Sequence, residues 1–189
     1  ITPIAYLVTN FAAPQAGREA TMTHDEVTTL FHEFGHTLHH ILTAQTEPQV
    51  SGINGVEWDA VELPSQFLEN FAWEHEIVKS ISAHVETGEQ LPDELFDKMI
   101  AAKNYEAGAF CVRQVEFALF DMLLHSAFDP KTDSVQALLD SVRREVAVVF
   151  PPAWNRFPQS FSHIFAGGYG AGYYSYKWAE VLSADCFSA

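Results

Sequence analysis

Residues 31–36 read Phe-His-Glu-Phe-Gly-His, and this stretch constrains the chain more than any other. On a helix, His32 and His36 lie on one face about one turn apart. Their imidazoles can then converge on a single tetrahedral zinc ion. Glu33 stands beside that ion, where it can take a proton from a water molecule bound there. The His-Glu-x-x-His pattern also arises by chance in unrelated helices, so its interpretation depends on the rest of the chain.

The residues around this motif predict a helix from Thr23 to about Ala44. Thr23 and Glu26 have the spacing of a capping box, which marks the start of a helix. Apolar residues recur at helical spacing along the segment: Val27, Leu30, Phe31, Phe34, Leu38, Ile41 and Leu42. The motif is therefore expected on an amphipathic helix that packs against a core.

A catalytic zinc site has three protein ligands and one open position, so a third ligand is needed. The acidic and histidine candidates downstream are His39, Glu57, Asp59, Glu62 and Glu69. His39 shares the face of the two motif histidines but lies about 10 Å along the axis from His32, too far to share the ion. We expect a neighbouring or substrate-side role for it, with an ordinary half-buried histidine as the alternative.

A second helix is expected to begin near Asp59 to Glu62 and to run towards Lys79, after a loop rich in turn residues. If it packs antiparallel to the first helix, Glu62 or Glu69 faces the two histidines. Glu62 and Glu69 are seven residues apart and share a face. One can bind the ion while the other orients a ligand histidine. For Glu69 a plain surface carboxylate remains the alternative.

The rest of the chain predicts further helices and one strand. Helical patterns cover a short segment from Pro92 and the ranges Tyr105–Phe128, Ser134–Phe150 and Tyr173–Phe187. Ile4–Phe11 is typical of a strand, which would offer a free edge to an extended peptide. We expect a mainly α fold, a zincin-like catalytic core of antiparallel helices with one edge strand or small hairpin.

A glycine-rich segment near the end of the chain is the second candidate site. Its sequence over residues 163–176 is His-Ile-Phe-Ala-Gly-Gly-Tyr-Gly-Ala-Gly-Tyr-Tyr-Ser-Tyr. The glycines weakly suggest a phosphate-binding loop, but no strand precedes them and no Lys-Ser/Thr follows. Neutral donors here can instead stabilise the negative charge that develops on an attacked peptide carbonyl, and the candidates are His163, Tyr169 and Tyr176. Tyr174 is expected to be a packing residue.

These segments together resemble a known family. His-Glu-Phe-Gly-His-Thr-Leu-His, then Ser51-Gly52, then Asp-Ala-Val-Glu-Leu-Pro-Ser-Gln-Phe-Leu-Glu-Asn over residues 59–70, resemble the thimet oligopeptidase/oligopeptidase A family of zinc metallopeptidases. That family takes its third ligand from the glutamate just before Pro-Ser-Gln, so the resemblance implies one zinc ion held by His32, His36 and Glu62. The Glu-x-x-x-Asp arrangement of thermolysin-like enzymes is not met, because Gln66 follows Glu62 by four residues.

The glycine-rich segment resembles the same family, whose loop carries a histidine and two tyrosines that contact the substrate or the transition state. The match falls on His163, Tyr169 and Tyr176, with Tyr173 as a further candidate. The continuation Lys-Trp-Ala-Glu-Val-Leu-Ser-Ala-Asp is most similar to the bacterial members of the oligopeptidase A branch. The resemblance implies that Glu33 acts as general base on metal-activated water, with Tyr176 at the oxyanion. It also implies short peptides as substrates, because a deep channel excludes folded proteins.

Composition restricts the classes of binding partner and the cellular compartment that we expect. The net charge of −15, from 25 acidic and 10 basic residues, disfavours nucleic acid and anionic membrane surfaces. No apolar run is long enough to span a bilayer, and no signal peptide is apparent. The two cysteines, Cys111 and Cys186, lack metal spacing, which favours buried thiols in a reducing, cytoplasmic compartment.

We interpret residues 1–189 as a catalytic-core piece of a longer zinc endopeptidase, whose missing remainder would include much of the channel wall. Two alternatives stay open. One is a dipeptidyl carboxypeptidase of the same family, which needs an anchor for the substrate carboxylate; four arginines are equivalent candidates from sequence, namely Arg113, Arg143, Arg144 and Arg156. The other is a non-catalytic peptide-binding fragment.

Overall fold

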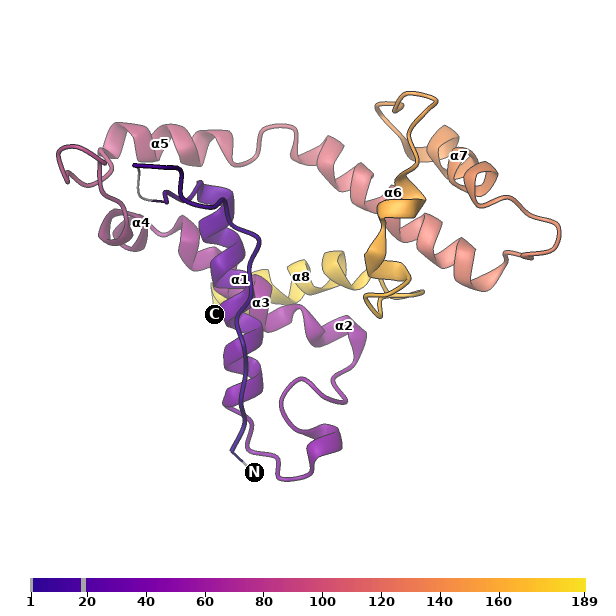
Figure 1. Ribbon diagram of the computed structural model, residues 1–189, viewed down its shortest axis with the longest axis horizontal. Helices are drawn as coiled ribbons and strands as arrows, with labels where there is room; N and C mark the ends of the chain where they lie inside the picture. Colours follow the sequence, from indigo (N-terminus) through magenta and orange to yellow (C-terminus); the bar gives the residue numbers. More distant parts are fainter. Residues whose placement is uncertain (1, 18–19) are drawn as a thin grey trace. The chain divides into compact units, whose positions relative to one another are not determined.

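The computed structural model describes residues 2–17 and 20–189, and these residues are mainly helical (Figure 1), as predicted. They form two compact units, which are described separately: Ile1–Lys103 with Ala179–Ala189, and Asn104–Trp178. The first unit holds α1 (His24–Ile41), η1 (Pro48–Val50), α2 (Trp58–Val61), α3 (Leu63–Glu69), η2 (Asn70–Trp73), α4 (His75–Ile81) and α5 (Asp93–Ala102). The second holds α6 (Ala107–Ser126), α7 (Val135–Val146), η3 (Phe157–Ser160), η4 (Ser162–Ile164) and the start of α8 (Ser175–Ser188).

The helix that carries the His-Glu-x-x-His motif begins as the sequence predicts. Thr23 is the N-cap of α1, and its hydroxyl accepts from the Glu26 amide at 3.2 Å. The Glu26 carboxylate accepts in return from the Thr23 amide at 2.8 Å, which completes the capping box. The same carboxylate also accepts from the amide of Ala12 at 3.1 Å. α1 ends at Ile41, three residues before the predicted end.

α1 packs against α3, and the two helices run antiparallel. Their direction follows from the pairs that meet, since His32 contacts Glu69 whereas His36 contacts Glu62. The crossing is close because Gly35 lies there and is buried. A Cβ at Gly35 would lie 2.5 Å from the carbonyl oxygen of Pro64 and 2.5 Å from the Cα of Ser65. Only a residue without a side chain lets the two backbones approach this far.

The second predicted helix is broken into shorter pieces. α2 ends at Val61, and α3 starts at Leu63 with Pro64 in its first turn. Pro64 has no backbone N–H to continue a hydrogen-bond ladder from α2, so a new helix starts there. α3 then tightens into η2, and an extended Glu74 separates η2 from α4. Glu62 therefore sits at a helix junction rather than within a helix.

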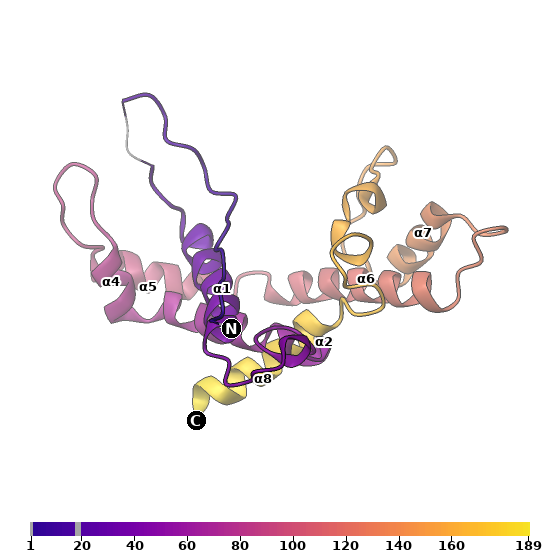
Figure 2. The same ribbon diagram turned by 60° about the horizontal axis from the view of Figure 1, so that its bottom comes forward.

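The remainder of the first unit packs around these pieces. α4 and α5 lie next to each other in Figure 2. They are in contact, since Nε2 of His75 lies 2.9 Å from the Asp93 carboxylate. Lys79 donates to the same carboxylate at 2.7 Å. The end of α8 reaches α3 and η2, because the Asn70 amide donates to the Ser183 hydroxyl at 3.0 Å. Rings of three phenylalanines meet there: Phe67, Phe71 and Phe187.

The second unit has its own apolar core. Its buried members are Phe120, Leu139, Val142, Phe161, Ile164 and Tyr173. Beside this core, the buried Glu116 of α6 accepts from Arg143 of α7 at 2.9 Å and from Arg113 at 2.5 Å. The long helix predicted over Tyr105–Phe128 corresponds to α6, whereas α7 stops at Val146, before the predicted end at Phe150.

The predicted edge strand over Ile4–Phe11 is not formed. No strand occurs in residues 2–17 and 20–189, so the segment finds no ladder partner there. An isolated extended segment has no partner for its backbone hydrogen bonds and is not a strand. Side chains from this segment are largely exposed, such as Tyr6 at 89% and Val8 at 76%.

None of the helices within the described ranges combines the length and the apolar character that crossing a bilayer requires.

Replacing Gly35 by alanine tests the close crossing of α1 and α3. The new methyl group overlaps backbone atoms of Pro64 and Ser65, which cannot rotate away. We expect Gly35→Ala to lower the free energy of unfolding by about 1–3 kcal/mol, measured by urea denaturation. Gly108→Ala is the matched control, because nothing lies within 4 Å of its added Cβ. It should leave stability unchanged or raise it by up to about 1 kcal/mol. Equal effects of the two changes would contradict the crossing.

Candidate functional site

Three side chains of the first unit converge on one point: His32, His36 and Glu62. Nε2 of His32 lies 3.3 Å from Oε2 of Glu62, and Nε2 of His36 lies 3.1 Å from the same oxygen. The candidate ligand atoms all lie within 4.8 Å of one another. The two rings stand nearly perpendicular, with centroids 4.9 Å apart. This group can hold a metal ion.

The donor set fits a divalent metal ion. Two imidazole nitrogens and one carboxylate oxygen match the His₂Glu ligands of catalytic metal sites, which leave one coordination position for water or substrate. Both histidines turn the same ring nitrogen towards Glu62, which is 1% exposed. A buried carboxylate is costly unless cations or hydrogen bonds compensate it. A bound cation would compensate it directly.

Local structure places each of these groups. His32 and His36 share a face of α1 because they are four residues apart. Glu62 reaches them because Gly35 lets the junction of α2 and α3 come close. Ser65 then fixes the Glu62 side chain, since its hydroxyl lies 2.9 Å from the carboxylate and 2.8 Å from the Glu62 carbonyl. Ser65 was not predicted as a site residue, although it is the serine of the Pro-Ser-Gln segment that follows Glu62.

Glu69 lies behind His32 rather than in the group. Its Oε1 is 2.6 Å from Nδ1 of His32, on the side of the ring opposite Nε2. Burial of the His32 ring lowers its pKa, but the carboxylates of Glu62 and Glu69 outweigh this effect and raise it to about 9. Binding of a cation at Nε2 would therefore release a proton. For His36, the corresponding Nδ1 is buried without a hydrogen-bond partner in the described part of the chain.

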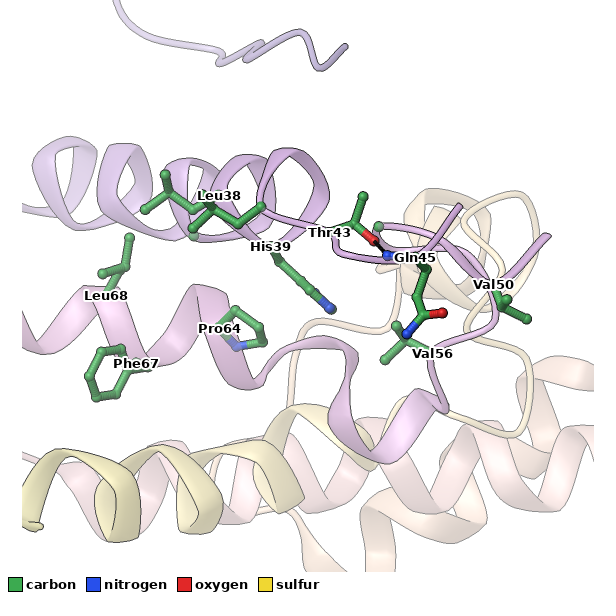
Figure 3. Close-up of a pocket in the computed structure, with 12 residues that line it drawn as sticks. Leu38, His39, Thr43, Gln45, Val50, Val56, Pro64, Phe67 and Leu68 are labelled. Carbon is green, nitrogen blue, oxygen red and sulfur yellow. Dashed lines mark hydrogen bonds between the residues drawn. The ribbon is translucent and has the colours of Figure 1, made fainter. Parts of the chain in front are cut away.

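Glu33 and His39 lie on the same helix but outside the group of three. Glu33 is half-buried on the turn between the two motif histidines. His39 points into a separate cavity of about 580 Å³ between α1, α3 and the loop that joins them (Figure 3). Burial, together with the charges of His36 and His40, lowers the pKa of His39. The lining of this cavity is mainly apolar and includes Leu38, Val56 and Phe67.

In the second unit, the three predicted residues of the glycine-rich loop form an aromatic cluster. The rings of Tyr169 and Tyr176 stack with centroids 4.9 Å apart. The His163 ring lies 6.2 Å from Tyr169 and 6.1 Å from Tyr176, measured between centroids. This loop segment therefore groups three side chains that can donate hydrogen bonds.

Tyr173, the further candidate, has a different environment. Its hydroxyl donates to the Gln114 side chain at 3.1 Å, and its ring is buried in the core of the second unit. Burial raises the pKa of Tyr173 to about 12, so the phenol stays neutral. Asp121 accepts from the loop amides of Ala171 and Tyr173. Neither Gln114 nor Asp121 could be found from sequence, because no local pattern connects them to the loop.

Comparison with known proteins gives the chain a family context. Oligopeptidase A of Salmonella typhimurium is 60% identical over 187 residues, which cover 98% of this chain and 28% of that protein. The organellar oligopeptidase A of Arabidopsis thaliana is 51% identical over 99% of the chain and 24% of its own length. The dipeptidyl carboxypeptidase of Escherichia coli is 36% identical over 97% of the chain and 27% of its own length. The chain thus spans only about a quarter of these relatives.

One protein family matches the chain along its whole length. Peptidase family M3 matches residues 1–189, a range that includes both the His32, His36 and Glu62 group and the aromatic cluster. With this match and the identities above, the chain belongs to peptidase family M3.

Proposed function

We propose that this chain is the catalytic core of a zinc-dependent endopeptidase that hydrolyses short oligopeptides. The observation that carries the proposal is the His32, His36 and Glu62 group, backed by Glu69, in a member of peptidase family M3. When bound, zinc supplies Lewis acidity, which polarises a peptide carbonyl and lowers the pKa of water. The chain spans 28% of the length of a 60% identical relative, so each experiment uses the full-length protein that contains it.

The residues of the first unit take distinct roles in this proposal. His32, His36 and Glu62 hold the metal ion. Glu69 accepts from Nδ1 of His32 and so directs Nε2 towards the ion. Glu33 is the general base: its carboxylate takes a proton from the attacking water and passes it to the leaving amine.

The aromatic cluster of the second unit supplies the oxyanion donor in this proposal. A peptide carbonyl gains negative charge as water attacks it, and a neutral hydroxyl can donate to that oxygen. Tyr176 is the proposed donor, with help from His163 or Tyr169, whose rings lie beside it. A donor held before the reaction stabilises the transition state without reorganising during it.

Short peptides are the proposed substrates, in line with the oligopeptidase names of the relatives. The 36% identity to a dipeptidyl carboxypeptidase supports the alternative activity. Among the four arginines considered as carboxylate anchors, Arg113 and Arg143 are already engaged by Glu116, which leaves Arg144 and Arg156. Release of dipeptides alone from a mixed peptide set would favour that alternative, whereas internal cleavage favours the endopeptidase. Cys111 and Cys186 are both exposed, so the prediction of buried thiols is wrong. A cytoplasmic location, expected from the low number of cysteines, is part of the proposal.

Removing the negative charge of Glu62 and that of Glu69 should lower zinc affinity to different extents. Glu62→Gln replaces a ligand with a neutral amide, so zinc affinity should fall by a large factor. Glu69→Gln leaves the three ligands intact and should cost less, about 10-fold to 100-fold. Both affinities can be measured by competition with a chelator at fixed pH. A larger loss in the Glu69 variant would exchange the two roles.

The general-base role of Glu33 predicts a separation of metal binding from turnover. Glu33→Gln leaves every ligand in place but has no group to accept the proton of water. The variant should retain zinc at the stoichiometry of the wild type, measured by atomic absorption, while peptide hydrolysis is abolished. Loss of zinc in proportion to activity would make Glu33 a structural residue or a ligand.

The oxyanion role of Tyr176 can be tested with one hydroxyl group. Tyr176→Phe keeps the ring and its stacking on Tyr169, so packing should survive. We expect kcat to fall about 10²-fold to 10³-fold with little change in KM, because the donor acts in the transition state. Tyr105→Phe is the control, since Tyr105 belongs to the same unit and is 78% exposed. Unchanged kcat in the Tyr176 variant would leave His163 or Tyr169 as the donor.

A further inference from the structure

We propose that Asp121 is a positioning residue for the catalytic loop, holding the backbone from Tyr169 to Tyr173 in the conformation that groups the donor side chains. This inference rests on the proposed function for its catalytic consequence. Its structural basis lies within the second unit alone, in contacts between α6 and the loop.

The Asp121 carboxylate binds the loop with both of its oxygens. Oδ1 accepts from the amide of Ala171 at 2.8 Å, and Oδ2 accepts from the amide of Tyr173 at 2.9 Å. The side chain is 1% exposed, so water cannot replace these donors. A buried carboxylate that lost them would lose two of the contacts that compensate its desolvation. The loop and the carboxylate therefore stabilise each other.

One of the two bonds is made at a strained residue. Ala171 has a φ of +57°, a left-handed conformation that an alanine side chain disfavours. Such a conformation persists only where surrounding contacts hold it. The hydrogen bond from the Ala171 amide to Asp121 is a contact of this kind. Without it, the backbone at Ala171 is expected to relax.

Backbone hydrogen bonds connect this point to the donor residues. The Gly172 amide, which lies between the two amides bound by Asp121, donates to the Tyr169 carbonyl at 2.8 Å. The Tyr169 amide donates in turn to the His163 carbonyl at 2.9 Å. On the other side, the Ser175 amide donates to the Gly172 carbonyl at 3.0 Å and starts the helix that carries Tyr176. A shift at Ala171 would therefore move the cluster.

His125 adds a further contact from α6. Its Nδ1 lies 2.8 Å from Oδ1 of Asp121, which orients the carboxylate. Its ring also packs closely against the loop, since a Cβ at Gly170 would lie 3.1 Å from Nε2.

Glu116 on the same helix has a different kind of partner. It is as buried as Asp121, but its charge is paired with Arg113 and Arg143, whereas no lysine or arginine in the described ranges pairs with Asp121.

The first test measures hydrogen exchange at single residues in the zinc-loaded, full-length wild-type protein, without substrate. The amides of Ala171 and Tyr173 should exchange slowly, because a buried carboxylate accepts from both. In Asp121→Asn the side chain keeps its size but has one acceptor oxygen instead of two, so one bond is lost. Exchange at the amide that loses its acceptor should rise about tenfold or more. Fast exchange in the wild type, or unchanged exchange in the variant, would overturn the inference.

The second test measures catalysis below the unfolding midpoint of every variant. Asp121→Asn should lower kcat about 10-fold to 100-fold, as expected for misplaced catalytic groups, while KM and bound zinc stay near wild type. Glu116→Gln is the matched control: it lowers stability but should leave loop exchange and kcat near wild type. Altered exchange with unchanged kcat would overturn the positioning role.

A double variant separates positioning from general loss of stability. Ala171→Gly removes the penalty for the left-handed conformation. Alone it should be close to wild type, and combined with Asp121→Asn it should restore part of the lost kcat. Failure of this rescue would overturn the role assigned to Ala171. If the full-length protein cleaves no peptide at all, the proposed function fails, whereas the exchange experiment still decides whether Asp121 holds the loop.

Discussion

The close contact between the backbone at Gly35 and the backbone at Pro64 and Ser65 is the constraint on which the candidate metal site depends. The four-residue spacing in the sequence places two imidazoles on one face of a helix. The third ligand has to come from another element. The missing side chain at Gly35 brings the α2–α3 junction within reach, and the break before Pro64 turns Glu62 towards the histidines. The same antiparallel crossing brings Glu69, at the C-terminal end of α3, to the back of His32.

Three carboxylates, each 1% exposed, organise the two units, and their partners account for their different roles. Glu62 faces two imidazoles, which is a suitable arrangement for binding a cation. Glu116 is neutralised by two arginines and joins α6 to α7. Asp121 accepts from loop amides and so fixes a backbone conformation. Since an uncompensated buried charge is costly, the identity of each partner indicates what the carboxylate does.

The sequence predicted the parts of this arrangement that depend on local chemistry. The capping box at Thr23 and Glu26 and the mainly helical fold are present as expected. The residues alone left Glu62 and Glu69 as alternatives for the third ligand, because seven-residue spacing puts both on one face and only the crossing separates them. The second helix was predicted too long, because Pro64 is compatible with the first turn of a helix and the extended Glu74 has no marker in the sequence. Asp121 lies 50 residues from Ala171, and no local pattern could join them.

The most direct test of the account is the position of the metal ion. Crystals of the zinc-loaded, full-length protein, measured at the zinc absorption edge, would locate the ion by its anomalous signal. The account predicts one peak, about 2.0–2.2 Å from Nε2 of His32, Nε2 of His36 and a carboxylate oxygen of Glu62, with Glu69 bound only to Nδ1 of His32. A peak bound by Glu69 or His39 in place of Glu62, or no zinc peak between these residues, would contradict it.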